Sequence, residues 1–225
     1  MLPGREFRLR GSLGGPTGTP WCKGYTVWIF IAKVILRISG WRWVGELPPE
    51  KKYVMLAVPH TSNWDGFWLL CLSLASGVRL RWMGKHTLLK APLGWITRPL
   101  GLVGIERSRA HNMVDQMKAQ FEANERFVLA IPPEGTRSLR THWKSGFYHI
   151  ALAAKVPVRL GYLDYGQRVG GYGPAIELTG DVCADMDRIR AFYEERDAKP
   201  RYADRFGPIR LRSEEDAEQD VRPAS

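Results

Sequence analysis

Residues 54–65, VMLAVPHTSNWD, join an apolar run to a polar turn that opens with a histidine. The run Val54–Val58 is typical of a buried strand, and a proline ends it. The apolar segment Phe67–Leu74 that follows predicts a helix, with Ser62 or Asn63 as its N-cap. A strand that passes through a turn into a helix predicts an α/β protein, and such turns carry reactive side chains.

The turn contains one histidine, His60, and one carboxylate, Asp65. Histidine is a good general base near neutral pH, and it works better when a carboxylate holds one ring nitrogen and leaves the other for the substrate. A turn of this length can bring the Asp65 carboxylate back to the His60 ring. This stretch alone also fits a strand-end histidine and a helix-capping aspartate, so the other motifs have to decide between the two interpretations.

From residue 53 onward, strand-like and helix-like segments alternate. The alternation predicts an α/β fold with a single mixed sheet and helices on both of its faces. The predicted strands are Tyr53–Val58, Arg79–Met83, Leu102–Ile105, Phe127–Ile131, Val156–Leu163 and Ala175–Leu178. The predicted helices are Trp64–Ser76, His86–Leu100, Ala110–Ala123, Trp143–Lys155 and Asp185–Arg196. We expect a polar connection at Trp41–Lys52 and a glycine-rich turn at Gly166–Pro174.

The amino-terminal part differs in composition from the rest. The stretch Trp21–Ile38 is strongly apolar, but Lys33 lies near its middle, and a spanning helix needs about 20 predominantly apolar residues. We therefore expect a helix that lies on a membrane surface, with a helix packed on the domain as the alternative. The chain then divides into a flexible tail, an interfacial membrane helix, one folded domain and a disordered acidic tail, at residues 1–20, 21–40, 41–212 and 213–225.

The formal net charge is +10, although the last segment is acidic. The rest of the chain is therefore still more basic, which suits an anionic partner such as phospholipid head groups, a phosphorylated substrate, an acidic carrier protein or nucleic acid. The three cysteines, Cys22, Cys71 and Cys183, lie far apart and predict neither a zinc site nor a disulfide framework. We expect no metal site and a reducing, cytoplasmic setting.

A second strand runs into a polar loop at Phe127–Ser138, FVLAIPPEGTRS. The loop holds the carboxylate of Glu134, and Gly135 lets the backbone approach a ligand closely. The amide of that glycine, the hydroxyl of Thr136 and the guanidinium of Arg137 are suited to phosphate or polyol oxygens. A surface loop with an Arg–Glu pair is the alternative.

Two further cations, Lys85 and Arg107, each follow a short apolar strand. If these strands are neighbours, both side chains lie at the same sheet edge as His60 and Glu134, where α/β proteins bind ligands. Together they predict an anion-binding site. The lysine ammonium supplies a compact positive charge, and the planar arginine guanidinium supplies a forked set of N–H donors.

These motifs together resemble the glycerolipid acyltransferase family, the bacterial 1-acyl-glycerol-3-phosphate acyltransferases and their relatives, over about residues 53–163. His60–Asp65 (HTSNWD) matches the HxxxxD motif of that family, and Gly104–Arg107 (GIER) matches its second motif. Glu134–Ser138 (EGTRS) matches the third motif, and Val156–Val158 (VPV) matches the fourth. Four motifs in the family's order make the resemblance specific.

The resemblance implies a glycerol-3-phosphate acyltransferase-like acyltransferase domain at residues 41–212. It implies an O-acyltransferase that moves a fatty acyl group from a thioester to the free hydroxyl of a lysophospholipid, foremost 1-acyl-glycerol-3-phosphate, which gives phosphatidic acid. His60, oriented by Asp65, would remove the hydroxyl proton, and Arg107 is associated with the substrate phosphate. No metal and no tightly bound cofactor are implied.

The acyl donor implied by the resemblance is acyl-CoA or acyl carrier protein. The family associates donor binding with its fourth motif, here Val156, Pro157 and Val158. The chain continues with Arg159, Leu160 and Gly161, where many members have a second proline.

Two alternatives remain open from the sequence. One is acyl transfer to a different lyso-lipid, such as one derived from an amino acid. The other is a basic module that binds nucleic acid, but the nine tryptophans do not form a basic–aromatic ladder, so we expect no nucleic-acid partner. The expected partners are a membrane phospholipid surface, the lyso-lipid and the thioester, and the expected location is peripheral or monotopic on the cytoplasmic face of the inner membrane.

Overall fold

The computed structural model describes residues 22–85, 87, 90, 94–98, 100–105 and 110–214. Seven strands form one sheet in the order β1-β7-β6-β2-β5-β3-β4, and each neighbouring pair is parallel except β6 and β7. The prediction of a single mixed sheet is confirmed. The strands are β1 (Arg42–Val44), β2 (Lys52–Val58), β3 (Leu80–Lys85), β4 (Leu102–Ile105), β5 (Phe127–Ile131), β6 (Val158–Asp164) and β7 (Val169–Ile176).

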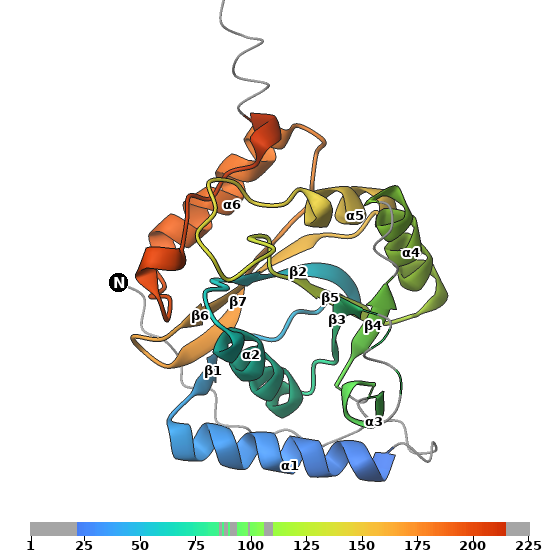
Figure 1. Ribbon diagram of the computed structural model, residues 1–225, viewed down its shortest axis with the longest axis vertical. Coiled ribbons are helices and arrows are strands. Elements are labelled where there is room, and N and C mark those ends of the chain that lie inside the picture. Colours follow the sequence, from blue (N-terminus) through green and yellow to red (C-terminus); the bar gives the residue numbers. More distant parts are fainter. Residues whose placement is uncertain are drawn as a thin grey trace, which may run out of the picture.

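Helices cover both faces of the sheet, as predicted (Figure 1). α4, α5 and α6 lie on one face, whereas α2 lies on the other and α1 packs against α2. The helices are α1 (Cys22–Ser39), α2 (Asn63–Ser76), α3 (Gly94–Thr97), α4 (Ala110–Ala123), α5 (Gly146–Ala154) and α6 (Val182–Arg196), and a short 3-10 helix spans Ala203–Arg205.

The central strand β2 is the apolar run that opens the sequence motif. It pairs in parallel with β5 on one side and β6 on the other. Val54 and Leu56 pack into the core under α4, α5 and α6, and Tyr53 and Met55 belong to a cluster on the opposite face. All four are at most 1% exposed, which is why the strand is apolar on both faces from Tyr53 to Val58. Because β2, β3 and β5 are parallel, the loops that follow them leave the same sheet edge, where α/β proteins bind ligands.

Two segments predicted as connections are strands. The polar connection at Trp41–Lys52 contains β1, and most of the glycine-rich segment Gly166–Pro174 belongs to β7, which extends the strand predicted at Ala175–Leu178. The glycines serve close packing rather than a turn, since a Cβ on Gly170 would lie 2.5 Å from Leu72 Cδ1. A strand composed this way has too few side chains to show a strand pattern.

Two predicted helices are shorter than expected. The helix predicted at His86–Leu100 is represented, within the residues that the structure describes, by α3 at Gly94–Thr97. The helix predicted at Trp143–Lys155 begins at Gly146, because Trp143 forms an isolated β-bridge with Leu211. The helices predicted at Trp64–Ser76 and Ala110–Ala123 agree with α2 and α4 to within one residue.

Helix α1 occupies the segment predicted to lie on a membrane, and it has two different faces. Ala32 and Leu36 are buried in a cluster with α2, so the alternative of packing on the domain is correct for one face. The other face exposes large apolar side chains, namely Val27, Phe30, Ile31, Val34 and Ile38. No helix among the described residues combines the length and the apolar character that crossing a bilayer requires.

The carboxyl-terminal boundary lies further along the chain than predicted. Ser213 and Glu214 were assigned to the acidic tail, but Glu214 is only 6% exposed and forms an ion pair with Arg190 of α6. Its other carboxylate oxygen accepts a hydrogen bond from the amide of Leu211. Residues 215–225, like the predicted flexible tail at residues 1–20, lie outside the described part of the chain.

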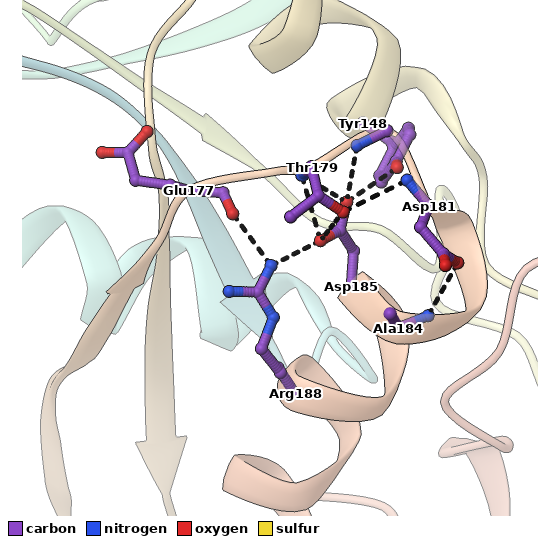
Figure 2. Close-up of polar contacts among 8 residues, drawn as sticks. Tyr148, Glu177, Thr179, Asp181, Ala184, Asp185 and Arg188 are labelled. Atoms are coloured by element: carbon purple, nitrogen blue, oxygen red, sulfur yellow. Dashed lines mark hydrogen bonds and ion pairs between the residues drawn. The ribbon is translucent and has the colours of Figure 1, made fainter.

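Asp185 anchors the start of α6, as Figure 2 shows. Its fully buried carboxylate accepts hydrogen bonds from the Tyr148 hydroxyl at 2.8 Å and from the Thr179 amide at 2.9 Å, and it forms an ion pair with Arg188. Burial raises the pKa of this carboxyl, but the hydrogen bonds from Tyr148, Arg188 and Thr179 outweigh burial and hold the pKa below its usual value. The network fixes α6 to α5 and to the end of β7.

Candidate active site

The turn after β2 has a fixed geometry because it caps α2. Ser62 is the N-cap, and its hydroxyl accepts a hydrogen bond from the Trp64 amide at 3.1 Å. The Asp65 carboxylate accepts a return hydrogen bond from the Ser62 amide at 2.7 Å, which completes a capping box. Asp65 therefore serves as a cap residue and is 2% exposed.

The same capping box brings Asp65 close to His60. The distance from His60 Nδ1 to Asp65 Oδ2 is 3.8 Å, which is an ion-pair distance and longer than a hydrogen bond. The Oδ1 atom of Asp65 accepts hydrogen bonds from the Ser62 hydroxyl at 2.9 Å and from the Tyr165 hydroxyl at 2.5 Å. One carboxylate therefore caps the helix and also faces the histidine, so the structure combines the two arrangements considered from the sequence, and the catalytic role of the pair stays a prediction.

The surroundings of His60 favour its neutral form. Burial lowers the pKa of the imidazole, Asp65 raises it, and the nearby Arg137 lowers it, with a net value below the usual 6.5. At neutral pH the ring is therefore unprotonated and able to accept a proton. With Nδ1 directed at Asp65, Nε2 is the atom left for a substrate.

Glu134 was expected to bind substrate, but in the structure its side chain is buried against the backbone of His60. Its side chain is 4% exposed, and its Oε1 atom accepts a hydrogen bond from the His60 amide at 2.9 Å. The other oxygen, Oε2, is buried and has no hydrogen-bond partner among the described residues. Burial raises the pKa of Glu134 to about 7. Glu134 thus links the loop after β5 to the backbone of the turn after β2.

The rest of that loop only partly matches the expected phosphate-binding role. Gly135 has a φ of 66°, and its amide donates to the Pro132 carbonyl at 3.1 Å, so this amide is already engaged within the loop. Thr136 Oγ1 accepts a hydrogen bond from the Ser138 amide at 3.4 Å. Arg137 is exposed and lines the cavity described next, which leaves it as the loop's candidate ligand-binding side chain.

A cavity of about 850 Å³ opens beside His60. Its polar lining comes from His60, Asn63, Asp65, Arg137 and Lys144. Most of its remaining wall is apolar and comes from β2, α2, β3, β5, α5 and β6, including Leu69, Leu70, Leu80, Trp82, Met83, Ile131, Phe147 and Leu163. The arrangement combines a histidine–aspartate pair, two cations and a largely apolar wall.

Lys144 was not among the predicted site residues. A Cβ on Gly135 would lie 2.8 Å from Lys144 Cγ, so the glycine allows the lysine stem to cross the loop closely. The sequence contained a signal for it, because residues 143–147 (WKSGF) resemble the Phe-Lys-x-Gly run that follows the third motif in many family members.

The two other predicted cations are only partly covered by the described residues. Strands β3 and β4 are parallel neighbours, and the backbone of Lys85 is paired with that of Ile105 at their carboxyl ends. The strands that precede Lys85 and Arg107 are therefore neighbours, which was the condition for placing both cations at one sheet edge. Arg107 and the side chain of Lys85 lie outside the described part of the structure.

The predicted donor-binding motif lies away from the cavity. Val158 begins β6 and pairs in register with Val54, near the start of β2, whereas His60 follows the end of β2. Val156 and Val158 are at most 9% exposed in the core, and Pro157 accepts a hydrogen bond from the Val54 amide. The three residues are at the opposite sheet edge, and β6 reaches the cavity instead through its other end, at Gly161, Tyr162 and Leu163.

Within the described residues, no group of histidine, cysteine, aspartate and glutamate side chains could hold a metal ion. Cys71 is buried, which raises the pKa of its thiol to about 11 and makes it a core residue rather than a nucleophile.

Comparison with known proteins identified a family and a similar solved structure. The model of the family described as Acyltransferase matches residues 40–159, which include all four motifs. Among solved structures, the 1-acyl-sn-glycerophosphate (LPA) acyltransferase PlsC from Thermotoga maritima superimposes with a TM-score of 0.53 at 17% sequence identity, over 80% of this chain and 82% of that chain. No curated protein matched. At 17% sequence identity, the structural similarity shows that the two proteins share a fold, and it does not show that they share a substrate.

Proposed function

The chain belongs to the acyltransferase family, and from this premise we propose that it transfers a fatty acyl group from a thioester to the free hydroxyl of a lysophospholipid. The observation that carries the proposal is the presence of the His60–Asp65 pair in the wall of a largely apolar cavity of about 850 Å³. The apolar wall can accommodate an aliphatic chain, and the polar side chains can hold the reacting groups.

In the proposed reaction, Nε2 of His60 removes the proton of the acceptor hydroxyl. The hydroxyl oxygen attacks the thioester carbonyl carbon, the C–S bond breaks, and the departing thiolate takes the proton back from His60. A general base of this kind contributes about 10²–10⁴-fold, and holding both reactants together contributes further. The chain needs no covalent acyl-enzyme, so the hydroxyl of Ser62 remains a cap.

The cations support an acidic acceptor, foremost 1-acyl-glycerol-3-phosphate. Arg137 and Lys144 line the cavity, where they are placed to bind the acceptor phosphate. Lys85 and Arg107 follow the neighbouring strands β3 and β4, and we propose that they extend the same anion site. The donor is acyl-CoA or acyl carrier protein, and no resident cofactor takes part.

We further propose that the enzyme works on the cytoplasmic face of the inner membrane, as a peripheral or monotopic protein. Both substrate and product are membrane lipids, so the site has to reach the bilayer surface. Support comes from the exposed apolar face of α1, which presents Phe30 and Ile38 beside Lys33 and Arg37. Apolar side chains flanked by cations favour an anionic membrane surface.

The test is mass spectrometry of lipid products after incubation with a panel of lyso-lipids and both thioester donors. We expect phosphatidic acid from 1-acyl-glycerol-3-phosphate with wild type and none with His60→Ala. His149→Ala is the matched control, because this second histidine is exposed on α5. If the enzyme prefers an amino-acid-derived lyso-lipid, that lipid is the acceptor in place of 1-acyl-glycerol-3-phosphate. If folded His60→Ala is fully active, His60 is not the base.

A further inference from the structure

Tyr165 contacts the catalytic pair from a distant part of the chain. It follows the last residue of β6, and its hydroxyl donates a hydrogen bond to Asp65 Oδ1 at 2.5 Å, although the two residues are 100 positions apart. Tyr165 lies beyond residues 40–159, the range that the family model matches. Nothing in the four sequence motifs indicates this contact.

The hydrogen bonds divide the two oxygens of Asp65 between different tasks. Oδ1 accepts from two hydroxyls, those of Tyr165 and Ser62, whereas Oδ2 accepts from the Ser62 amide and faces His60 Nδ1. Rotation of the carboxylate would break several of these contacts at once. Tyr165 thus holds the orientation in which Oδ2 is directed at the histidine.

The tyrosine ring is held independently of Asp65. It makes an edge contact with Trp41, with ring centroids 5.0 Å apart and planes at 87°. Trp41 in turn stacks on Trp68 of α2 at 5.0 Å. The Tyr165 amide donates to the Lys199 carbonyl at 2.9 Å. The hydroxyl is therefore presented by a rigid support, which is the requirement for a residue that positions another.

The hydroxyl also withdraws charge from Asp65. Burial and the Asp65 carboxylate raise the pKa of Tyr165, so its hydroxyl remains a donor throughout the working pH range. The hydrogen bond reduces the negative charge on the Asp65 carboxylate. Asp65 therefore stabilises the protonated imidazole of His60 less, and the His60 pKa is lower than it would be without the bond. The other charged or titratable groups near the pair are Glu134 and Arg137 from the loop after β5 and Arg201 from the segment after α6.

We propose that Tyr165 is a positioning residue that orients Asp65 and, through Asp65, sets the proton affinity of His60. The inference rests on the proposed acyl transfer for its kinetic consequence, but its effect on His60 is independent of the reaction. Tyr165→Phe removes only the hydroxyl and keeps the contact with Trp41.

Two measurements test the proposal on the full chain. In Tyr165→Phe we expect kcat to fall about tenfold while the acceptor KM stays within about twofold, because the lost contact orients the base and does not touch substrate. We also expect the His60 pKa, followed by NMR of ¹⁵N-histidine-labelled protein and assigned with His60→Asn, to rise. Tyr202→Phe is the matched control, since it removes a hydroxyl from an exposed ring beside the same turn.

The two possible failures are distinguishable. A wild type that acylates no lyso-lipid in the panel removes the proposed function, but the NMR titration still tests Tyr165. An unchanged His60 pKa in Tyr165→Phe overturns the inference, whatever the kinetics show. If Tyr165→Phe does not fold, 3-fluorotyrosine placed at position 165 gives a second test, because its stronger donor lowers the His60 pKa without changing the packing.

Discussion

The carboxylate of Glu134 accepts a hydrogen bond from the backbone amide of His60 at 2.9 Å. Two loops that follow neighbouring parallel strands are therefore joined by a buried contact directly below the proposed base. The contact explains why a glutamate occupies this loop although its side chain is 4% exposed. Glu134 supports the turn, and the residues that line the cavity are the candidates for substrate binding.

Glu134→Gln should change how stability depends on pH. Burial raises the pKa of Glu134 from an ordinary 4.5 to about 7, so between these values the unfolded chain releases the proton and the folded chain keeps it. Stability of the wild type therefore falls as pH rises through this window, by up to about 3 kcal/mol relative to the glutamine variant. Urea unfolding of both proteins at pH 5 and pH 8 measures the difference, and equal pH dependence would contradict the buried protonated state.

Ser62→Ala should test whether Ser62 is a nucleophile. Loss of the N-cap side chain lowers the unfolding free energy by about 1 kcal/mol. It also removes one of the two hydroxyl donors to Asp65 Oδ1, so turnover should fall about tenfold, as in Tyr165→Phe, and should not be abolished. Thermal unfolding and the acyl-transfer assay measure the two effects. Complete loss of activity in a folded Ser62→Ala protein, with an acylated serine trapped in the wild type, would show a covalent mechanism instead.

The pH profile of kcat/KM should have its acidic limb below pH 6.5. The base must be unprotonated, and burial, followed by the effects of Asp65 and Arg137, leaves the His60 pKa below its usual value. Activity should therefore rise with pH through that lowered pKa and reach a plateau before neutrality. A limb centred above pH 7 would mean that a different group, or a charged histidine, controls the reaction.

Arg137→Gln should affect both the acceptor and the base. A charge-assisted contact is worth about 1.5–3 kcal/mol, so the acceptor KM should rise about tenfold or more. Because Arg137 lowers the His60 pKa, its removal should also move the acidic limb to higher pH. Arg140→Gln, at an exposed position in the same loop, is the control and should change neither quantity.

The exposed face of α1 can be tested without removing the helix. Phe30 and Ile38 are 68% and 82% exposed, so replacing both with serine should leave the melting temperature nearly unchanged and reduce sedimentation with anionic vesicles. Leu36→Ala is the contrasting variant, since this buried side chain packs against α2 and its truncation should lower the melting temperature. Undiminished vesicle binding by the serine variant would assign membrane contact to another surface.

The sequence predicted the central strands well because their physical environment is uniform. β2 and β5 are buried on both faces, so an apolar run marks them directly. Most of β7 was predicted as a turn because its glycines are required by neighbours that only the folded structure brings together, such as Leu72 of α2. A local pattern cannot contain a requirement imposed by a distant side chain.

The candidate site shows the same limit. The approach of His60 and Asp65 was predictable because five positions and one helix cap determine it. The Glu134 contact depends on the register between two strands, and the Tyr165 contact on where β6 ends. The assignment of Val156–Val158 to donor binding came from resemblance alone, and the parallel register of β6 with β2 places that motif at the other sheet edge.

The position of β2 in the sheet also has a consequence for synthesis on the ribosome. Both strands that pair with β2, namely β5 and β6, are made after it. A nascent chain therefore carries the apolar run Val54–Val58 without any partner strand until β5 has emerged, and without its second partner until Asp164 has emerged. Unpaired apolar strands associate with other chains. Completion of β6 therefore supplies the last partner of the central strand, and a ribosome stalled earlier would hold a chain in which one edge of β2 is open.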